Sequence, residues 1–121
     1  MLKVISAGAL AALLLAGAAQ AQSAVYTWTG FGVNVLGSSK CPTYKMTIDV
    51  TVDGADVKGR FQQEGRAERN FQAKLDNNGV LKTTAAVSGG GMMDVIGQIK
   101  DGESRIKLDG YCIFEGKLTK K

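Results

Sequence analysis

The sequence contains no histidine, one proline and two cysteines among its 121 residues. Without histidine the chain cannot build a His-based catalytic triad, use an imidazole general base or ligate a metal through imidazole. Two cysteines alone are too few for a thiolate zinc site or an iron–sulfur cluster. G-x-S-x-G, P-loop and G-x-G-x-x-G motifs are also absent. We therefore predict no catalytic residue, no metal and no cofactor, and expect that the protein is not an enzyme.

The chain is short and weakly basic. Fifteen Lys and Arg residues face 11 Asp and Glu residues, a formal net charge of +4. The lysines are spread over many segments, and no aromatic-basic motif of the RNA-binding kind occurs, so we expect no nucleic-acid partner. The length is too small for two domains with separate cores.

Residues 1–21 are typical of a cleavable export signal. Lys3 supplies a positive start, residues 4–19 are apolar, and Ala19-Gln20-Ala21 has the small-x-small pattern of a cleavage site. The apolar run is shorter than the roughly 20 residues of a bilayer span, which disfavours the alternative of an uncleaved anchor. We predict a signal peptide over 1–21 and one β-barrel-like domain over 22–121. The domain is expected to be periplasmic or secreted by a bacterium, with no membrane span.

Export changes the interpretation of the two cysteines. Outside the cytosol an even number of cysteines favours a disulfide, and Cys41 with Cys112 is the only pairing available. The alternative, a redox or nucleophilic cysteine, is disfavoured because there is no C-x-x-C spacing and no histidine. Closing a loop of about 70 residues would stabilise the fold by about 4 kcal/mol on the chain-entropy model.

The residues after the leader alternate between apolar and polar throughout. Residues 44–52 show this period of two most clearly, and no segment after the leader keeps a helical period over ten residues. The pattern predicts an all-β fold of about eight strands. The expected strands cover 26–35 (with a kink at Gly30 or Gly32), 44–52, 55–62, 71–76, 81–87, 93–99, 106–108 and 112–118.

Turn residues predict how these strands pair. An Asp53-Gly54 loop would place Val52 opposite Ala55, and the loop at Asp101-Gly102 would place Ile106 opposite Gly97. Asn77-Asn78-Gly79 predicts another hairpin turn, and 88–91 a loose loop. Asp109-Gly110 is either a tight turn or a bulge, and the apolar rows favour a bulge or a looser turn.

Eight strands joined by short turns predict an antiparallel up-and-down meander. Each strand has one apolar face, and a long sheet of this kind leaves two bare edges. We therefore expect a closed or flattened barrel. A disulfide between the segment after the first strand and the last strand fits such a closure. A two-sheet sandwich is the alternative.

Two groups of residues are candidates for binding. The segment 60–71 carries three of the four arginines that follow the leader, and arginine binds carboxylate, phosphate or polysaccharide groups through its planar fork. The alternative is a solvated loop whose glutamates neutralise it. The candidate arginines are Arg60, Arg66 and Arg69, and the glutamates are Glu64 and Glu68.

Tyr26 and Trp28 form the second candidate, because alternate positions share a strand face. They would either plug one end of the core or line a ligand cavity, as in lipocalin-like or avidin-like barrels. A filled core is the favoured alternative for so short a chain. Three aspartates, at positions 49, 53 and 56, would lie near one hairpin end, but carboxylates are ordinary beside such a turn.

The chain resembles small exported proteobacterial β-domains of unassigned function. The likeness covers Val25 to Leu118 and rests on Trp28 in the first strand, Cys41 before the second, the Asp-Gly and Asn-Gly turns, and Cys112 in the last strand. In size, leader and single disulfide the chain is also similar to exported barrel inhibitors of lysozyme and of metalloproteases. No inhibitory motif matches, so no residue role is carried over.

These observations favour an exported binding or inhibitory module that uses its loops or a barrel mouth. Its target, a protein or an anionic or polysaccharide group, and its oligomeric state are left open. A carrier of a small ligand in an internal cavity and a structural or adhesive envelope component are alternatives. An enzyme that uses carboxylates alone is the least favoured.

Overall fold

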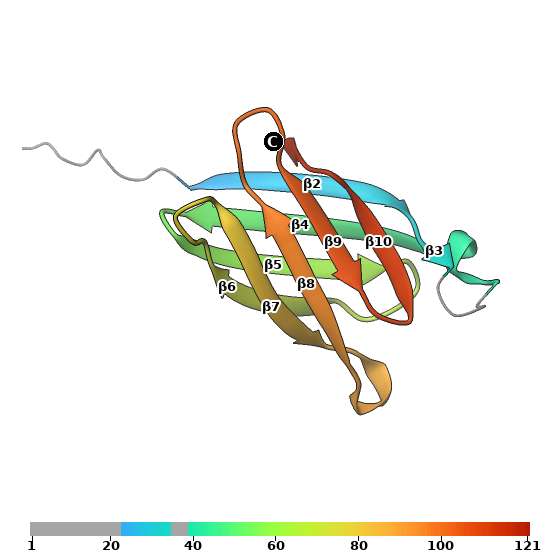
Figure 1. Cartoon of the computed structure of the whole chain (residues 1–121). Helices are drawn as coiled ribbons and strands as arrows, with labels where there is room; N and C mark the ends of the chain where they lie inside the picture. Colours follow the sequence, from blue (N-terminus) through green and yellow to red (C-terminus); the bar gives the residue numbers. More distant parts are fainter. Residues whose placement is uncertain (1–22, 35–38) are drawn as a thin grey trace, which may run out of the picture.

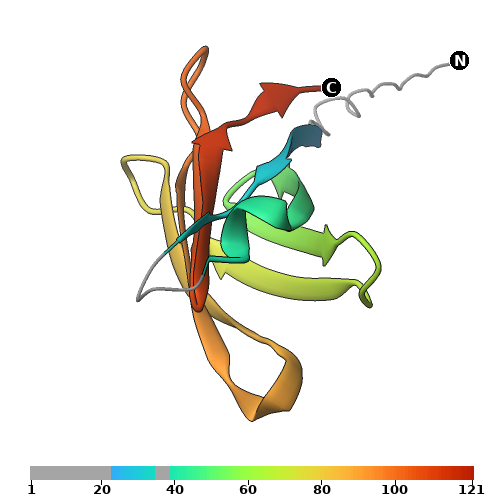
Figure 2. The same cartoon turned by 90° about the vertical axis from the view of Figure 1, so that its right-hand side faces the viewer.

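The computed structural model describes residues 23–34 and 39–121 and shows an all-β fold. Ten strands form two five-stranded antiparallel sheets that pack face to face, with their strands crossing (Figures 1 and 2). The predicted leader and the end of the predicted first strand at Val35 lie outside the described residues. The two-sheet sandwich, the alternative to the barrel, is therefore the observed architecture.

The first sheet has the order β11-β2-β4-β5-β6 and the second the order β3-β10-β9-β8-β7. The first contains β2 (Ala24–Phe31), β4 (Lys45–Asp53), β5 (Asp56–Gln63), β6 (Arg69–Lys74) and β11 (Thr119–Lys120). The second contains β3 (Val33–Asn34), β7 (Val80–Ala86), β8 (Met92–Gln98), β9 (Arg105–Asp109) and β10 (Cys112–Lys117). The 3-10 turns η2 (Cys41–Thr43) and η3 (Ser88–Gly90) are the helical segments of the described ranges, and neither is long or apolar enough to cross a membrane.

Apolar and polar residues that alternate in the sequence point to opposite faces of their strands, as the sequence predicts. In β4, Met46, Ile48 and Val50 are buried between the sheets, whereas Lys45 and Thr47 are exposed. A strand is present at each predicted position, but the predicted first strand is divided at Gly32 into β2 and β3, which belong to different sheets. The longer strands contribute their apolar rows to one core because one face of each sheet is buried, whereas the two-residue strands β3 and β11 are exposed.

The register of the β4–β5 hairpin differs from the prediction. Val52 pairs with Val57 rather than with Ala55, and the two loop residues are Gly54 and Ala55. Gly54 has a φ of 65°, the left-handed value that a tight hairpin turn requires and that glycine adopts without strain. The partner of Val52 is displaced by two residues. Since side chains alternate between the two faces of a strand, both valines still point inward.

Two other registers are as the sequence predicts. Ile106 pairs with Gly97 across β8 and β9. At the β9–β10 connection Leu108 pairs with Phe114 rather than with Tyr111, so the turn there is the looser one. Both apolar rows therefore face the core.

The predicted closed barrel is wrong, because the meander is interrupted between β6 and β7. These consecutive strands belong to different sheets, and no register joins them in the described residues. The predicted turn at Asn77-Asn78-Gly79 does form, but it connects the two layers. Asp76 Oδ1 accepts hydrogen bonds from the backbone N–H groups of Asn78 and Val80 at 2.8 and 2.9 Å. The two open sheets therefore keep edge strands, β6 and β7 among them, that a closed barrel would have paired.

The chain also passes from one sheet to the other after β2 and after β10, on the side of the sandwich away from the β6–β7 connection. After β2 the chain crosses to the second sheet, where β3 pairs with β10, and after β10 it crosses back, so that β11 pairs with β2. The predicted disulfide between Cys41 and Cys112 is present at this side, with a Cα–Cα distance of 5.6 Å. The disulfide thus links the η2 turn, which precedes β4 of the first sheet, to β10 of the second sheet.

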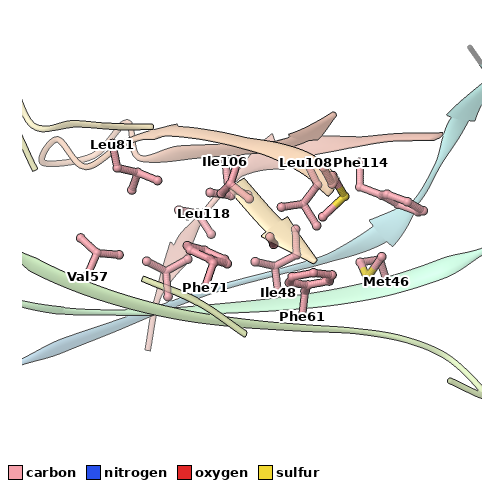
Figure 3. Packing of buried hydrophobic residues seen from close by; sticks show 14 of the residues in the cluster. Met46, Ile48, Val57, Phe61, Phe71, Leu81, Ile106, Leu108, Phe114 and Leu118 are labelled. Atoms are coloured by element: carbon pink, nitrogen blue, oxygen red, sulfur yellow. The ribbon is translucent and has the colours of Figure 1, made fainter. Parts of the chain in front are cut away.

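The space between the sheets is filled by interdigitated apolar side chains. Figure 3 shows Leu81, Ile106 and Phe114 from one sheet facing Phe71 and other side chains of the other sheet. Glycines in the inner rows do not leave the core hollow: the ring of Phe71 occupies the place where a Cβ at Gly59 would stand. The favoured sequence interpretation, a filled core, describes this part of the molecule.

Candidate functional site

A cleft of about 360 Å³ opens between the sheets at one end of the sandwich. Three connections surround it: residues 64–68 between β5 and β6, the η3 loop between β7 and β8, and the β9–β10 turn. Figure 1 shows these connections at the same end of the molecule. A volume of this size lies at the lower end of the range of small-molecule pockets.

The floor of the cleft is apolar. Met46 and Phe61 come from the first sheet and Met93 and Phe114 from the second, and all are at least 94% buried. Figure 3 shows Met46, Phe61 and Phe114 at the end of the core. The cleft is therefore a place where the end of the core meets solvent.

The rim contains two large apolar side chains that the fold leaves in water. Met92 is 61% exposed and Tyr111 is 71% exposed. Met46, Met92 and Met93 are the only methionines after Met1, so every methionine of the described chain lines this one cleft. Methionine side chains are flexible and polarisable, which suits an apolar surface that adapts to a ligand.

Arg69 enters the cleft because of its place in the strand register. It pairs with Phe61 across β5 and β6, and paired residues point to the same face, so its side chain lies on the inner face of the sheet. It is only partly exposed. Since Phe61 belongs to the apolar floor, Arg69 brings a positive charge directly beside that floor.

Arg66 reaches the cleft from the connecting loop. Its backbone N–H donates to the carbonyl oxygen of Gln63 at 2.9 Å, and its own carbonyl accepts a hydrogen bond from Gln62 Nε2 at 2.8 Å. The loop is thus held to the end of β5. Neither Arg66 nor Arg69 forms an ion pair within the described part of the chain.

Arg60, the third predicted arginine, lies on the opposite face of the sheet. Its Nε atom is 3.2 Å from Asp49 Oδ2 and a terminal nitrogen is 3.2 Å from Glu68 Oε1. The interpretation of a self-neutralised segment therefore describes Arg60. It does not describe Arg66 or Arg69, because Glu68 is engaged on the outer face.

Asp49 is the carboxylate most affected by this outer cluster. Burial raises its pKa, but the Thr27 hydroxyl, Arg60 and Lys121 together outweigh burial and hold the pKa below the ordinary value. Lys121 Nζ lies 3.7 Å from Asp49 Oδ1. A carboxylate paired in this way has a structural role.

The remaining aspartates of the hairpin do not assemble into a metal site. Asp53 and Asp56 pair across the end of the hairpin, and Asp56 forms an ion pair with Lys74. This ion pair lowers the pKa of Asp56. In the ranges described, no group of three or more His, Cys, Asp or Glu side chains is placed to hold a metal ion.

Tyr26 and Trp28, the predicted aromatic pair, lie elsewhere. Both face inward from β2, opposite Val50 and Ile48, and pack at the edge of the core. The Trp28 indole covers Gly116 of β10. Neither aromatic lines the cleft, so the structure brings together two of the five predicted binding residues, Arg66 and Arg69.

Sequence reasoning missed the methionines and Tyr111. Met46 and Met93 are indistinguishable from other core residues in the alternating pattern. Met92 and Tyr111 carried a usable signal, because each is a large apolar residue at a polar position of its strand or turn. The cleft itself is lined by residues of both sheets that lie far apart in the sequence, so it has no local signature.

The cleft lining offers little for covalent or acid–base chemistry. It contains no Asp, Glu or Ser side chain, and its cysteine, Cys112, is oxidised in the disulfide. What it offers is an apolar floor, the phenols of Tyr44 and Tyr111, the Gln63 amide and two guanidinium groups. No family model and no curated protein matches this chain.

Proposed function

We propose that the protein is an exported, non-enzymatic binding module that takes its ligand in the cleft between the two sheets. One observation carries the proposal: an apolar floor opens to solvent beside two arginines that have no ion-pair partner among the described residues. Apolar pockets with a few convergent polar groups are the usual form of a ligand site.

Export is part of the proposal and is supported by two features. The disulfide needs an oxidising compartment to form and persist, and residues 1–21 have the pattern of a signal peptide. The absence of carboxylate and nucleophilic side chains from the cleft lining supports binding rather than catalysis.

A protein ligand is the second candidate, favoured by the exposure of Met92 and Tyr111. Methionine, tyrosine and arginine are enriched in protein interfaces. A partner that inserts one side chain between the three connections would make the protein an inhibitor or adaptor. This function also agrees with the resemblance in size, leader and single disulfide to exported inhibitors of lysozyme and of metalloproteases.

Methyl NMR of the methionine side chains tests the proposal directly, because three methyl groups report on one cleft. The labelled protein is mixed with the low-molecular-weight fraction and, separately, with the protein fraction of an extract of the source cells. We expect the Met92 and Met93 signals to shift with one fraction. Shifts confined to amides of the outer faces, with unchanged methionine signals, would contradict binding in the cleft.

Two alanine variants provide a matched control. Ala67 lines the rim of the cleft and Ala55 lies in the turn at the other end of β5, and both are exposed. Ala67→Trp is expected to block the cleft and abolish the methionine shifts. Ala55→Trp adds the same ring at the far end and is expected to leave the shifts unchanged.

A further inference from the structure

We infer that the ligand of the cleft is a small amphipathic anion, a carboxylate or phosphate group joined to an apolar chain or ring. This inference rests on the proposed function and specifies its ligand. It follows from the placement of two cations beside an apolar floor, from the lack of acidic groups in the lining, and from the size of the cleft.

The positive end of the cleft is built from Arg66 and Arg69. Arg69 is only partly exposed and stands beside the buried ring of Phe61, where water competes less for its guanidinium than on an open surface. The nearby Glu68 is directed to Arg60 on the other face. The two guanidinium groups are therefore available to an external anion, which arginine binds through paired N–H donors.

The apolar end is built from Met46, Met93 and Phe114. Their burial means that an apolar group of a ligand would replace water over side chains that are already packed. Met92 and Tyr111 at the rim would cover such a group from the solvent side. Charged and apolar side chains thus line the same cleft, as an amphiphile requires.

The size of the cleft limits the ligand. About 360 Å³ corresponds to roughly twelve water volumes of about 30 Å³ each. This is room for about a dozen heavy atoms, the size of a ten-carbon fatty acid. A longer chain would protrude past Tyr111, and a phospholipid with two long chains would not fit.

Decanoate is the probe that tests the inference, with decanol and decyltrimethylammonium as comparisons of the same chain length. The mature protein carrying labelled methionine methyl groups is titrated with each below its micelle concentration. We expect decanoate to shift the three methionine signals and to bind at least about tenfold more tightly than decanol. Added salt should weaken the binding of decanoate more than that of decanol.

Arginine variants identify the source of this preference. Arg66→Gln and Arg69→Gln are each expected to weaken decanoate binding by about tenfold and to leave decanol binding unchanged. Arg105→Gln is the control, because Arg105 is exposed on β9 and does not line the cleft. Arg66 lies in an exposed loop, so the test stands even if the Arg69 variant folds poorly.

The outcomes separate this inference from the function on which it rests. Equal affinity for decanoate, decanol and the ammonium compound, with shifts of the same methyl groups, would overturn the anion and retain the cleft as a binding site. Methionine shifts with the protein fraction alone, and with none of the amphiphiles, would overturn the small ligand in favour of a protein. No methionine shift with any probe or fraction would overturn both.

Discussion

The indole of Trp28 lies directly against the backbone of Gly116, so that a Cβ atom at position 116 would overlap Nε1 of the ring. Trp28 belongs to β2 and Gly116 to β10, which are in different sheets. The contact therefore joins the layers at the side where the chain crosses between them. Phe71 over Gly59 is a second contact of this kind, within the first sheet.

Gly116→Ala should destabilise the protein, because the new methyl group must displace the indole or the strand. The cost of such overpacking is about 1–3 kcal/mol. Urea unfolding followed by Trp28 fluorescence measures it. Gly91→Ala is the control, because its Cβ would meet only Val87 Cγ2 at 3.4 Å. Equal stability of both variants would mean that the indole does not pack as described.

Replacing both cysteines should cost more than the Gly116→Ala substitution. The Cys41→Ala/Cys112→Ala variant loses the closure of a long loop, worth about 4 kcal/mol on the chain-entropy model. Thermal unfolding of the variant and of the wild type in the absence of reductant compares them. A wild-type product with two free thiols in its mass spectrum, or a variant of unchanged stability, would contradict this assignment.

The stability should depend on pH through Asp49. Because its pKa is lowered on folding, the stability it contributes is present above its ordinary pKa of 3.8 and is lost as the pH falls through the folded value. Asp49→Asn should therefore lower the free energy of unfolding by about 1 kcal/mol at pH 7. The difference from the wild type should disappear in acid. The control is Asp53→Asn, because Asp53 forms no ion pair in the described ranges.

Mild peroxide should oxidise the methionines of the cleft in a fixed order. Met92 is 61% exposed and is expected to form the sulfoxide first, whereas Met46 and Met93, at 4% and 6%, should react only when the protein opens. Peptide mass spectrometry after a time course measures the order. A ligand that fills the cleft should slow the oxidation of Met92, and equal rates at all three positions would contradict the burial described.

The sequence predicts strands and inward rows well, because alternation is a local property. It also predicts the pairing of Ile106 with Gly97, since a short turn between two apolar rows permits few registers. At Gly54 the same reasoning misplaces the turn by one residue on each strand. A shift of the pairing partner by two residues keeps the apolar side chains of both strands on the inner face. The alternating pattern therefore cannot distinguish the two registers.

Local sequence patterns do not determine whether the strands close into one barrel or divide into two sheets. Asn77-Asn78-Gly79 turns the chain both in a hairpin and in a connection between layers, and Asp76 caps the turn in either arrangement. Whether β6 and β7 pair depends on the twist accumulated over both sheets. The same holds for the arginines: Arg69 reaches the cleft only through its register opposite Phe61.

The pairing of β3 with β10 and of β11 with β2 sets the order in which the two sheets can be completed. A polypeptide emerges from its N-terminus, yet β2 acquires its outer neighbour β11 from residues 119–120, and β3 acquires β10 only a few residues earlier. Before residues 119–120 have been synthesised, β2 lacks this neighbour and its free edge can pair with another chain. Assembly of both sheets therefore requires residues 112–120 as well as the strands that precede them.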